Sequence, residues 1–361
     1  DRAGFVIGGN DWIVNTNAGA FVSIATASFL GALWAPAAAH NQVTALAVLA
    51  VFTGLHWVGL RLGRAVTASI CVVVGLMLLM LAVGCFLATP APASTATAPA
   101  HSAASLPLMS AAMIAVIVMA LRAVLQTFDG WYAPIYVAEE SADPARTLPR
   151  AIIGGTLLVA ALYLIINIAF IRVLPLPVLA ASQLPAAEAA RLFLPRGGAE
   201  IVTVISLLTM LSVLNATLIC APRILLGLSR DGLGTQRAAA VSASGTPRFA
   251  LGLSSVIAAL LILTGTFEQI IALAVVLFVC IYISAYAALF VLRRREPDLP
   301  RPYRAFGFPY STAVVLLGSV LFLVAAVSAD PRSAIIVGAL FIASVPAYAF
   351  VKRCQREAER P

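Results

Sequence analysis

The chain has 361 residues, of which 61% are hydrophobic and only 11% charged, and its mean hydropathy is +1.00. Soluble globular proteins are usually about half apolar and about one quarter charged. This composition therefore excludes a cytosolic enzyme, a disordered chain and a nucleic-acid-binding domain. The net charge is +8, but the basic residues lie in short segments between long apolar runs, as they do in membrane proteins. The sequence predicts an integral membrane protein with the lipid bilayer as its surroundings.

Ten apolar runs approach the roughly 20 residues that a helix needs to cross a bilayer. They are apolar on all sides and do not alternate as barrel strands would, so we expect an all-α, polytopic transmembrane bundle that forms one domain over residues 1–361. The fourth and sixth runs are too long for one upright helix. In chain order the expected spans cover residues 12–36, 43–58, 66–88, 108–138, 150–174, 198–228, 249–264, 269–292, 310–328 and 333–351.

The basic residues predict the orientation of these spans. Of the 23 Lys and Arg residues, 17 fall in segments on one side and four on the other. The positive-inside rule places the richer side in the cytoplasm, so we expect both ends of the chain there and a location in the cell (inner) membrane. Segment 89–107 then becomes an external connector, and segment 176–197 a short amphipathic piece on the outer surface.

The fourth span contains the most informative stretch, Thr127–Pro134, with the sequence TFDGWYAP. Gly130 and Pro134 both weaken a helix, one by its backbone freedom and the other by its missing N–H. Asp129 places a carboxylate near mid-membrane, where a charge must be paired or hydrated. The stretch is typical of the broken helices that bind polar ligands in transporters, although a proline kink with a structural hydrogen bond at Asp129 is the plainer interpretation.

Four motifs together resemble a known family. The run Phe128–Gly155, FDGWYAPIYVAEESADPARTLPRAIIGG, is similar to the sixth helix and following loop of amino acid permeases of the amino acid–polyamine–organocation (APC) superfamily. Asn215–Leu233, containing NATLICAPR and SRDGL, resembles the eighth helix of that family. Pro297–Pro309, PDLPRPYRAFGFP, resembles its loop after the tenth helix, and Gly8–Trp12, GGNDW, the start of its third helix.

The resemblance implies an inverted-repeat (5+5) fold in which the substrate binds between broken helices one and six. Because three spans precede the sixth-helix motif, the ten spans correspond to helices three to twelve of that fold. We therefore expect a chain that lacks the first two helices, and hence one wall of the site, and that does not carry out coupled transport by itself.

The same resemblance implies which residues bind the substrate, an amino acid or a polyamine. The broken helix would supply backbone groups, with Phe128 or Trp131 covering the site. The third and eighth helices would supply small and polar side chains, for which hydrogen bonds between helices are the alternative role. The implied substrate-binding residues are Thr127, Phe128, Asp129, Gly130, Trp131, Tyr132, Asn15, Gly19, Asn215 and Thr217.

Charged residues near the broken helix indicate gates. Glu139, Glu140 and Arg146 lie at its cytoplasmic end, where the resemblance implies an inner gate that Asp11 and Arg230 could join. Arg122, two turns before Asp129, is either an outer-vestibule residue or the partner of a carboxylate such as Glu200 or Glu268. Arg223 follows Pro222 near the inner end of its span, and snorkelling to the interface is the simplest account of it.

The sequence leaves the transport mode open. Some family members carry a lysine in the fifth helix that replaces a coupling sodium, whereas this chain has Val74 near that position and only Lys352 elsewhere. Substrate exchange and proton coupling through Asp129 both stay possible, as does any oligomeric state. An intramembrane enzyme using Asp129 with Glu139 or His56, and a channel, are the competing classes. Nothing in the sequence indicates a cofactor, a metal site or a nucleic-acid partner.

Overall fold

The computed structural model describes residues 2–90, 111–182, 184–264, 267–329 and 331–358, and these contain helices and turns but no strand. The expected external connector, 89–107, lies almost entirely outside the described residues. The elements are α1 (Arg2–Leu33), α2 (Ala35–Ala39), α3 (Asn41–Val58), α4 (Leu60–Leu87), α5 (Ala111–Phe128), the 3₁₀ helix η2 (Ala133–Glu140), α6 (Pro144–Val173), α7 (Leu176–Ala181), α8 (Pro185–Phe193), α9 (Gly198–Arg230), the 3₁₀ helix η3 (Gln236–Ala239), α10 (Arg248–Thr264), α11 (Phe267–Arg295), α12 (Tyr310–Ala329) and α13 (Pro331–Ala358).

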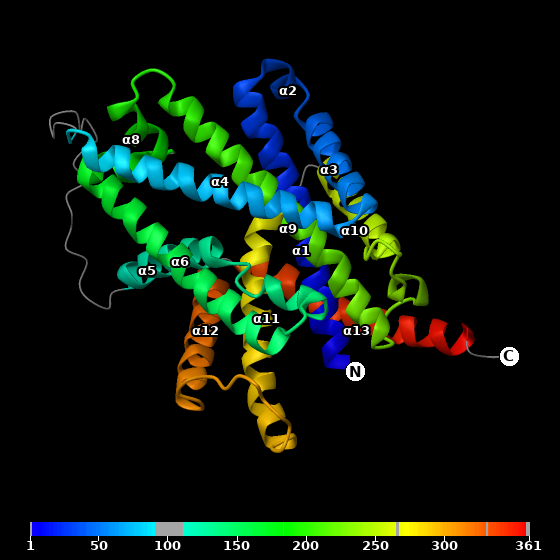
Figure 1. Cartoon of the computed structure of the whole chain (residues 1–361). Coiled ribbons are helices and arrows are strands. Elements are labelled where there is room, and N and C mark those ends of the chain that lie inside the picture. Colours follow the sequence, from blue (N-terminus) through cyan, green and yellow to red (C-terminus); the bar gives the residue numbers. More distant parts are fainter. Residues whose placement is uncertain (1, 91–110, 183, 265–266, 330, 359–361) are drawn as a thin grey trace.

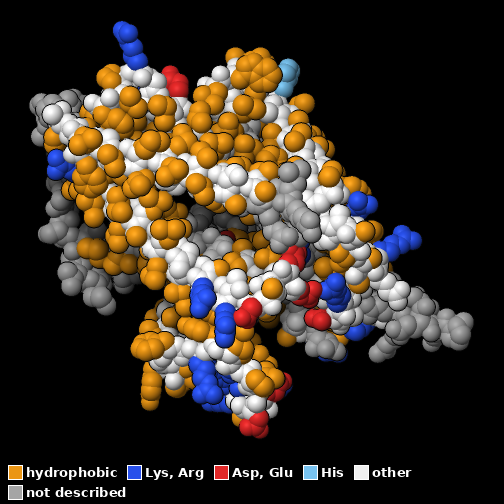
Figure 2. Space-filling model, in the orientation of Figure 1, with side chains coloured by type: hydrophobic (Ala, Val, Ile, Leu, Met, Phe, Trp, Pro, Cys, Tyr) orange, Lys and Arg blue, Asp and Glu red, His pale blue; other side chains and the backbone are white. Residues whose placement is uncertain are grey.

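Eight of these helices are long and apolar enough to cross a membrane: α1, α3, α4, α6, α9, α11, α12 and α13. The fourth and seventh expected spans are represented by shorter apolar helices, Val116–Leu125 within α5 and Arg248–Thr264. The fourth span is short because its helix ends at Phe128, whereas one continuous span was expected over residues 108–138. Much of the lateral surface carries hydrophobic side chains, as Figure 2 shows over α4 and α6.

The centre of the bundle is the pair α1 and α9, which cross in the middle of Figure 1 and also contact α3 and α10. Alanines at 20, 27, 45 and 258 and the fully buried Leu214 and Leu251 form the core between these four helices. Small side chains let membrane helices approach closely, where dispersion contacts hold them together. The extended α1–α9 contact makes this pair the frame against which the site is positioned.

Two short helices, α7 and α8, lie within segment 176–197, and α8 has the amphipathic character expected there. In α8 the residues Ala187, Ala189 and Ala190 are buried, and the helix contacts α4 and α9. Ser182 donates a hydrogen bond of 2.5 Å to Glu188 and so fixes the turn between the two helices.

Candidate functional site

The interruption expected in the fourth span is present. Helix α5 ends at Phe128, residues 129–132 form turns, and η2 begins at Ala133. Gly130 has a φ of +92°, in the left-handed region that glycine tolerates best. The Ala133 N–H donates to the Gly130 carbonyl at 3.0 Å, a tighter pattern than that of an α-helix. At the break, backbone N–H and C=O groups no longer make the regular hydrogen bonds of an α-helix.

Asp129 is paired with a side chain that the sequence did not identify. Its carboxylate accepts a hydrogen bond from the hydroxyl of Tyr282 in α11. The Trp131 ring packs beside the same tyrosine with centroids 5.8 Å apart. The hydrogen bond from Tyr282 therefore holds the Asp129 side chain against α11 inside the bundle.

Four aromatic rings, those of Trp131, Tyr132, Tyr136 and Tyr282, form what we name the aromatic cluster. Tyr132 lies between Tyr136 and Tyr282, with centroid separations of 5.7 Å to each and near-perpendicular rings. Edge-to-face pairs at this separation are a favoured aromatic geometry. The cluster joins the break, η2 and α11 into one surface of rings and hydroxyl groups.

A second carboxylate, Asp11 of α1, closes the other end of the aromatic cluster. The Tyr136 hydroxyl donates to Asp11 at 2.5 Å, and the Asn15 amide donates to Asp11 at 3.0 Å. Asp11 is only 7% exposed. The sequence had placed Asp11 with the gate charges, but its partners are the neutral groups of Tyr136 and Asn15. Two carboxylates thus flank the cluster, each held by a tyrosine hydroxyl.

Thr127 and Phe128 point to a different neighbour. The Thr127 hydroxyl donates to the Ala123 carbonyl within its own helix at 2.7 Å, and the Thr127 carbonyl accepts from Tyr163 of α6 at 3.4 Å. The Phe128 ring packs edge-on against Tyr163, with centroids 5.3 Å apart. Of the two residues expected to cover the site, Trp131 is therefore the one that belongs to the aromatic cluster.

The candidates on α1 and α9 divide into two groups. Asn15 joins Asp11, and Gly19 approaches Thr217, whose hydroxyl would lie 3.8 Å from a β-carbon added at Gly19. Thr217 itself donates to the Leu214 carbonyl at 2.9 Å. These positions lie along the tight α1–α9 contact, with Asn15 nearest to the aromatic cluster through Asp11.

Asn215 makes hydrogen bonds between helices, the alternative role that the sequence left open for it. It is fully buried, its amide oxygen lies 2.6 Å from the His56 Nε2 atom on α3, and its amide nitrogen donates to Thr67 on α4. Thr246 adds a hydrogen bond of 2.9 Å to the His56 carbonyl. Both ends of the Asn215 amide are thus engaged away from the break, since adjacent positions on a helix face different directions.

Two ion pairs connect η2 to α9. Arg223 donates to Glu140 at 2.5 and 2.8 Å and to the Ile219 carbonyl at 2.7 Å. The Arg223 side chain is only 7% exposed, so the expectation of snorkelling is wrong: Arg223 is buried and pairs with Glu140, whose side chain is 25% exposed. Arg230 pairs with Glu139 at 2.6 Å near the surface.

The other gate candidates are less connected. Arg146 contacts Asp143 of its own segment at 3.7 Å, and both side chains are largely exposed. Arg146 is thus part of the helix start of α6, where Asp143 also caps its backbone N–H. The side chains of Arg122 and Glu268, a pair considered from the sequence, lie outside the described residues.

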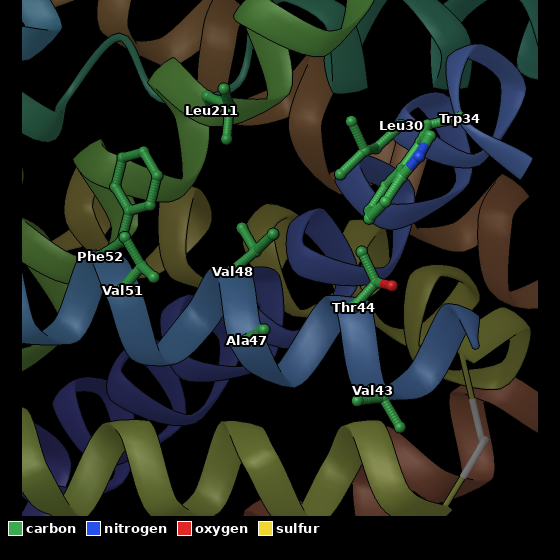
Figure 3. A pocket seen from close by; sticks show the side chains of 9 residues that line it. All are labelled: Leu30, Trp34, Val43, Thr44, Ala47, Val48, Val51, Phe52 and Leu211. Carbon is green, nitrogen blue, oxygen red and sulfur yellow. The ribbon is translucent and has the colours of Figure 1, made fainter. Parts of the chain in front are cut away.

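A separate pocket of about 350 Å³ lies between α1, α3 and α9. Figure 3 shows its mostly apolar lining, in which the Thr44 hydroxyl and the Trp34 indole nitrogen are the polar groups. It contains none of the residues at the break and has no group that would bind an amino acid's charges. Within the described part of the chain, no cluster of three or more His, Cys, Asp or Glu side chains could hold a metal ion.

Comparison with known proteins agrees with this architecture. The chain is similar to the serine/threonine exchanger SteT of Bacillus subtilis, with 24% identity over 65% of this chain and 54% of SteT. It is 28% identical to the b(0,+)-type amino acid transporter 1 of Rattus norvegicus over 61% of this chain and 45% of that protein. The branched-chain amino acid permease BcaP of Bacillus subtilis is 27% identical over 53% of this chain and 41% of BcaP. In each case the similarity extends over about half of the relative's length.

These relatives are transporters and not enzymes, so the enzyme alternative is no longer supported. The matched family model is described as amino acid permease and covers residues 2–351, nearly the full chain. With an all-helical bundle whose fourth span is interrupted, the chain belongs to the amino acid permease family, as its four motifs predicted.

Proposed function

We propose that this chain forms the substrate-binding and gating part of a secondary transporter for amino acids or related amines. The observation that carries the proposal is the interruption at residues 129–132, with Asp129 bonded to Tyr282 beside exposed backbone polar groups. An amino acid has one ammonium and one carboxylate group, and a broken helix offers acceptors and donors for both. Family membership supports amino acids as the transported class. The geometry supports residues 129–132 as the place where the substrate binds.

The aromatic cluster suits the ammonium end of the substrate. A cation is attracted to the faces of Trp and Tyr rings. Tyr282, which donates a hydrogen bond to the Asp129 carboxylate, packs against both Trp131 and Tyr132. In this proposal the turn at residues 129–132, which lies outside the α-helix, meets the carboxylate end. Thr127 and Phe128 then contribute backbone and packing, and Gly19 with Thr217 sets the spacing between α1 and α9.

The ion pairs between η2 and α9 suit an inner gate. Arg223–Glu140 and Arg230–Glu139 both cross from the segment after the break to α9. Alternating access requires contacts on one side of the site to break while those on the other form. In this proposal the η2 segment moves away from α9 when the site opens to the cytoplasm, the side on which the distribution of basic residues predicts both chain ends.

The test is amino acid counterflow into liposomes by the protein that carries this sequence. We expect Asp129→Asn and Tyr282→Phe each to reduce transport at low substrate concentration by about tenfold or more, because hydrogen bonds to charged groups contribute about 1.5–3 kcal/mol. Tyr348→Phe is the matched control, since its ring packs on Phe5 away from the break.

Retained stereoselective counterflow in both site variants would refute this placement. Dependence of the rate on internal substrate would support exchange, and dependence on a pH gradient that Asp129→Asn abolishes would support proton coupling. A conductance without counterflow would instead favour a channel.

A further inference from the structure

The segment between α11 and α12 concentrates positive charge at one corner of the molecule. The lower ends of these helices project beyond the rest of the bundle in Figure 1, and Figure 2 shows Lys and Arg side chains gathered there. Only Glu296 and Asp298 oppose this charge within the segment. We name as the basic corner the arginines Arg293, Arg294, Arg295, Arg301 and Arg304.

Two of these arginines build the corner. Arg301 donates to the carbonyls of Glu296, Pro297 and Leu299 at 2.6, 3.0 and 3.0 Å and so holds the segment in a closed turn. Arg293 lies over the Phe308 ring, with its guanidinium carbon 3.8 Å from the centroid.

The Arg293 guanidinium has an unsatisfied donor. Its buried Nε atom has no hydrogen-bond partner among the described residues. The Phe308 ring also packs against Phe290, with ring centroids 5.3 Å apart. The segment therefore has a fixed shape, and the Arg293 charge is oriented by packing and not by a carboxylate.

The outer part of the corner combines charge with exposed aromatic rings. Arg294, Arg295 and Arg304 are exposed, while Phe306 is 93% and Tyr310 81% exposed. Such exposure of aromatic rings is unfavourable in water. At the edge of a bilayer, however, aromatic rings lie favourably at headgroup depth, and arginines attract anionic headgroups.

We infer that the basic corner binds the phosphate of anionic phospholipids, with Phe306 and Tyr310 inserted at the boundary between headgroups and acyl chains. Planar guanidinium groups match phosphate oxygens in charge and geometry. A lipid is the partner that fits, because α11 and α12 on either side are both helices of membrane-spanning length and composition. The inference concerns a surface away from the break and does not depend on the proposed transport function.

The test compares binding of phosphatidylglycerol and phosphatidylcholine to the detergent-purified protein by native mass spectrometry. The test variant is R294Q/R295Q/R304Q, and the matched control is R146Q/R150Q/R237Q, which removes the same charge from three other exposed arginines. Each arginine near an anionic surface contributes roughly a fivefold change in binding. We expect the test variant to lose the preference for phosphatidylglycerol by at least about tenfold and the control to keep it.

A second variant, F306S/Y310S, preserves the charge and is expected to weaken binding of phosphatidylglycerol in vesicles without changing the circular dichroism spectrum. Equal losses in the test and control triple variants would overturn the inference, since they would show attraction by overall charge. Competition by inorganic phosphate at equal concentration would also overturn it, since the site would then bind a free anion. Unchanged lipid preference in R294Q/R295Q/R304Q would do the same.

Discussion

Neighbouring glutamates in η2 provide a controlled measurement of how burial changes the strength of an ion pair. Glu140 and Glu139 both pair with arginines of α9, at 2.5 and 2.6 Å. The Arg223–Glu140 side chains are 7% and 25% exposed, whereas those of Arg230–Glu139 are 44% and 78% exposed. The substitutions Glu140→Gln and Glu139→Gln remove the same charge from adjacent positions.

The expected losses differ because the remaining arginine is left in different surroundings. Breaking a buried ion pair by removing one partner typically costs about 3–5 kcal/mol. Since Glu140 stays one quarter exposed, we expect Glu140→Gln to lower the free energy of unfolding by about 2 kcal/mol. Exposed pairs contribute about 0–1 kcal/mol, so Glu139→Gln should cost about 0.5 kcal/mol or less.

The assay is reversible unfolding of the purified protein in mixed micelles of increasing denaturing-detergent content, followed by circular dichroism. Double-mutant cycles, with Arg223→Gln for Glu140 and with Arg230→Gln for Glu139, isolate each interaction from the other effects of the substitutions. We expect a coupling free energy of about 2 kcal/mol for Glu140 with Arg223, and a value near zero for Glu139 with Arg230. Equal losses for the two glutamate variants, or a coupling near zero for the buried pair, would refute the reasoning.

Three further predictions concern the backbone and the topology. Gly130→Ala should reduce uptake and destabilise the protein by about 1–2 kcal/mol, because a β-carbon is strained at a φ of +92°. Gly154→Ala, which has open space around it in α6, is the control and should not destabilise the protein. Gly84→Ala should lower the free energy of unfolding by about 1–3 kcal/mol, because the added β-carbon would lie 2.5 Å from the Phe193 ring. A variant that unfolds at the same temperature as the wild type would contradict this contact. A cysteine introduced at Ser94 should react with an impermeant maleimide in intact right-side-out vesicles, and labelling only after permeabilisation would reverse the predicted orientation.

The sequence by itself determined the class of fold and the place of the break. Long apolar runs leave no alternative to helices in a bilayer, because each backbone polar group must be satisfied within its own segment. Gly130 and Pro134 predict the interruption because each weakens the helix locally. The structure has the interruption between Phe128 and Ala133. The four motifs were sufficient to predict the family that the comparison confirms.

Which side chains meet was decided only by the tertiary structure. The sequence identified Asp129 but not Tyr282, which is 153 residues away and reaches it only because α11 packs beside the break. The ion pair of Arg223 with Glu140 and the hydrogen bonds of Asn215 to His56 and Thr67 were not predicted, because a helical residue's partner depends on which neighbouring helix faces it. The Asp11–Asn15 hydrogen bond joins positions four apart on one helix, but from the sequence the two residues had been assigned separately, to the gate and to the substrate site. The ion pairs and the aromatic cluster join residues from separate helices, so their geometry depends on the long-range packing of the bundle.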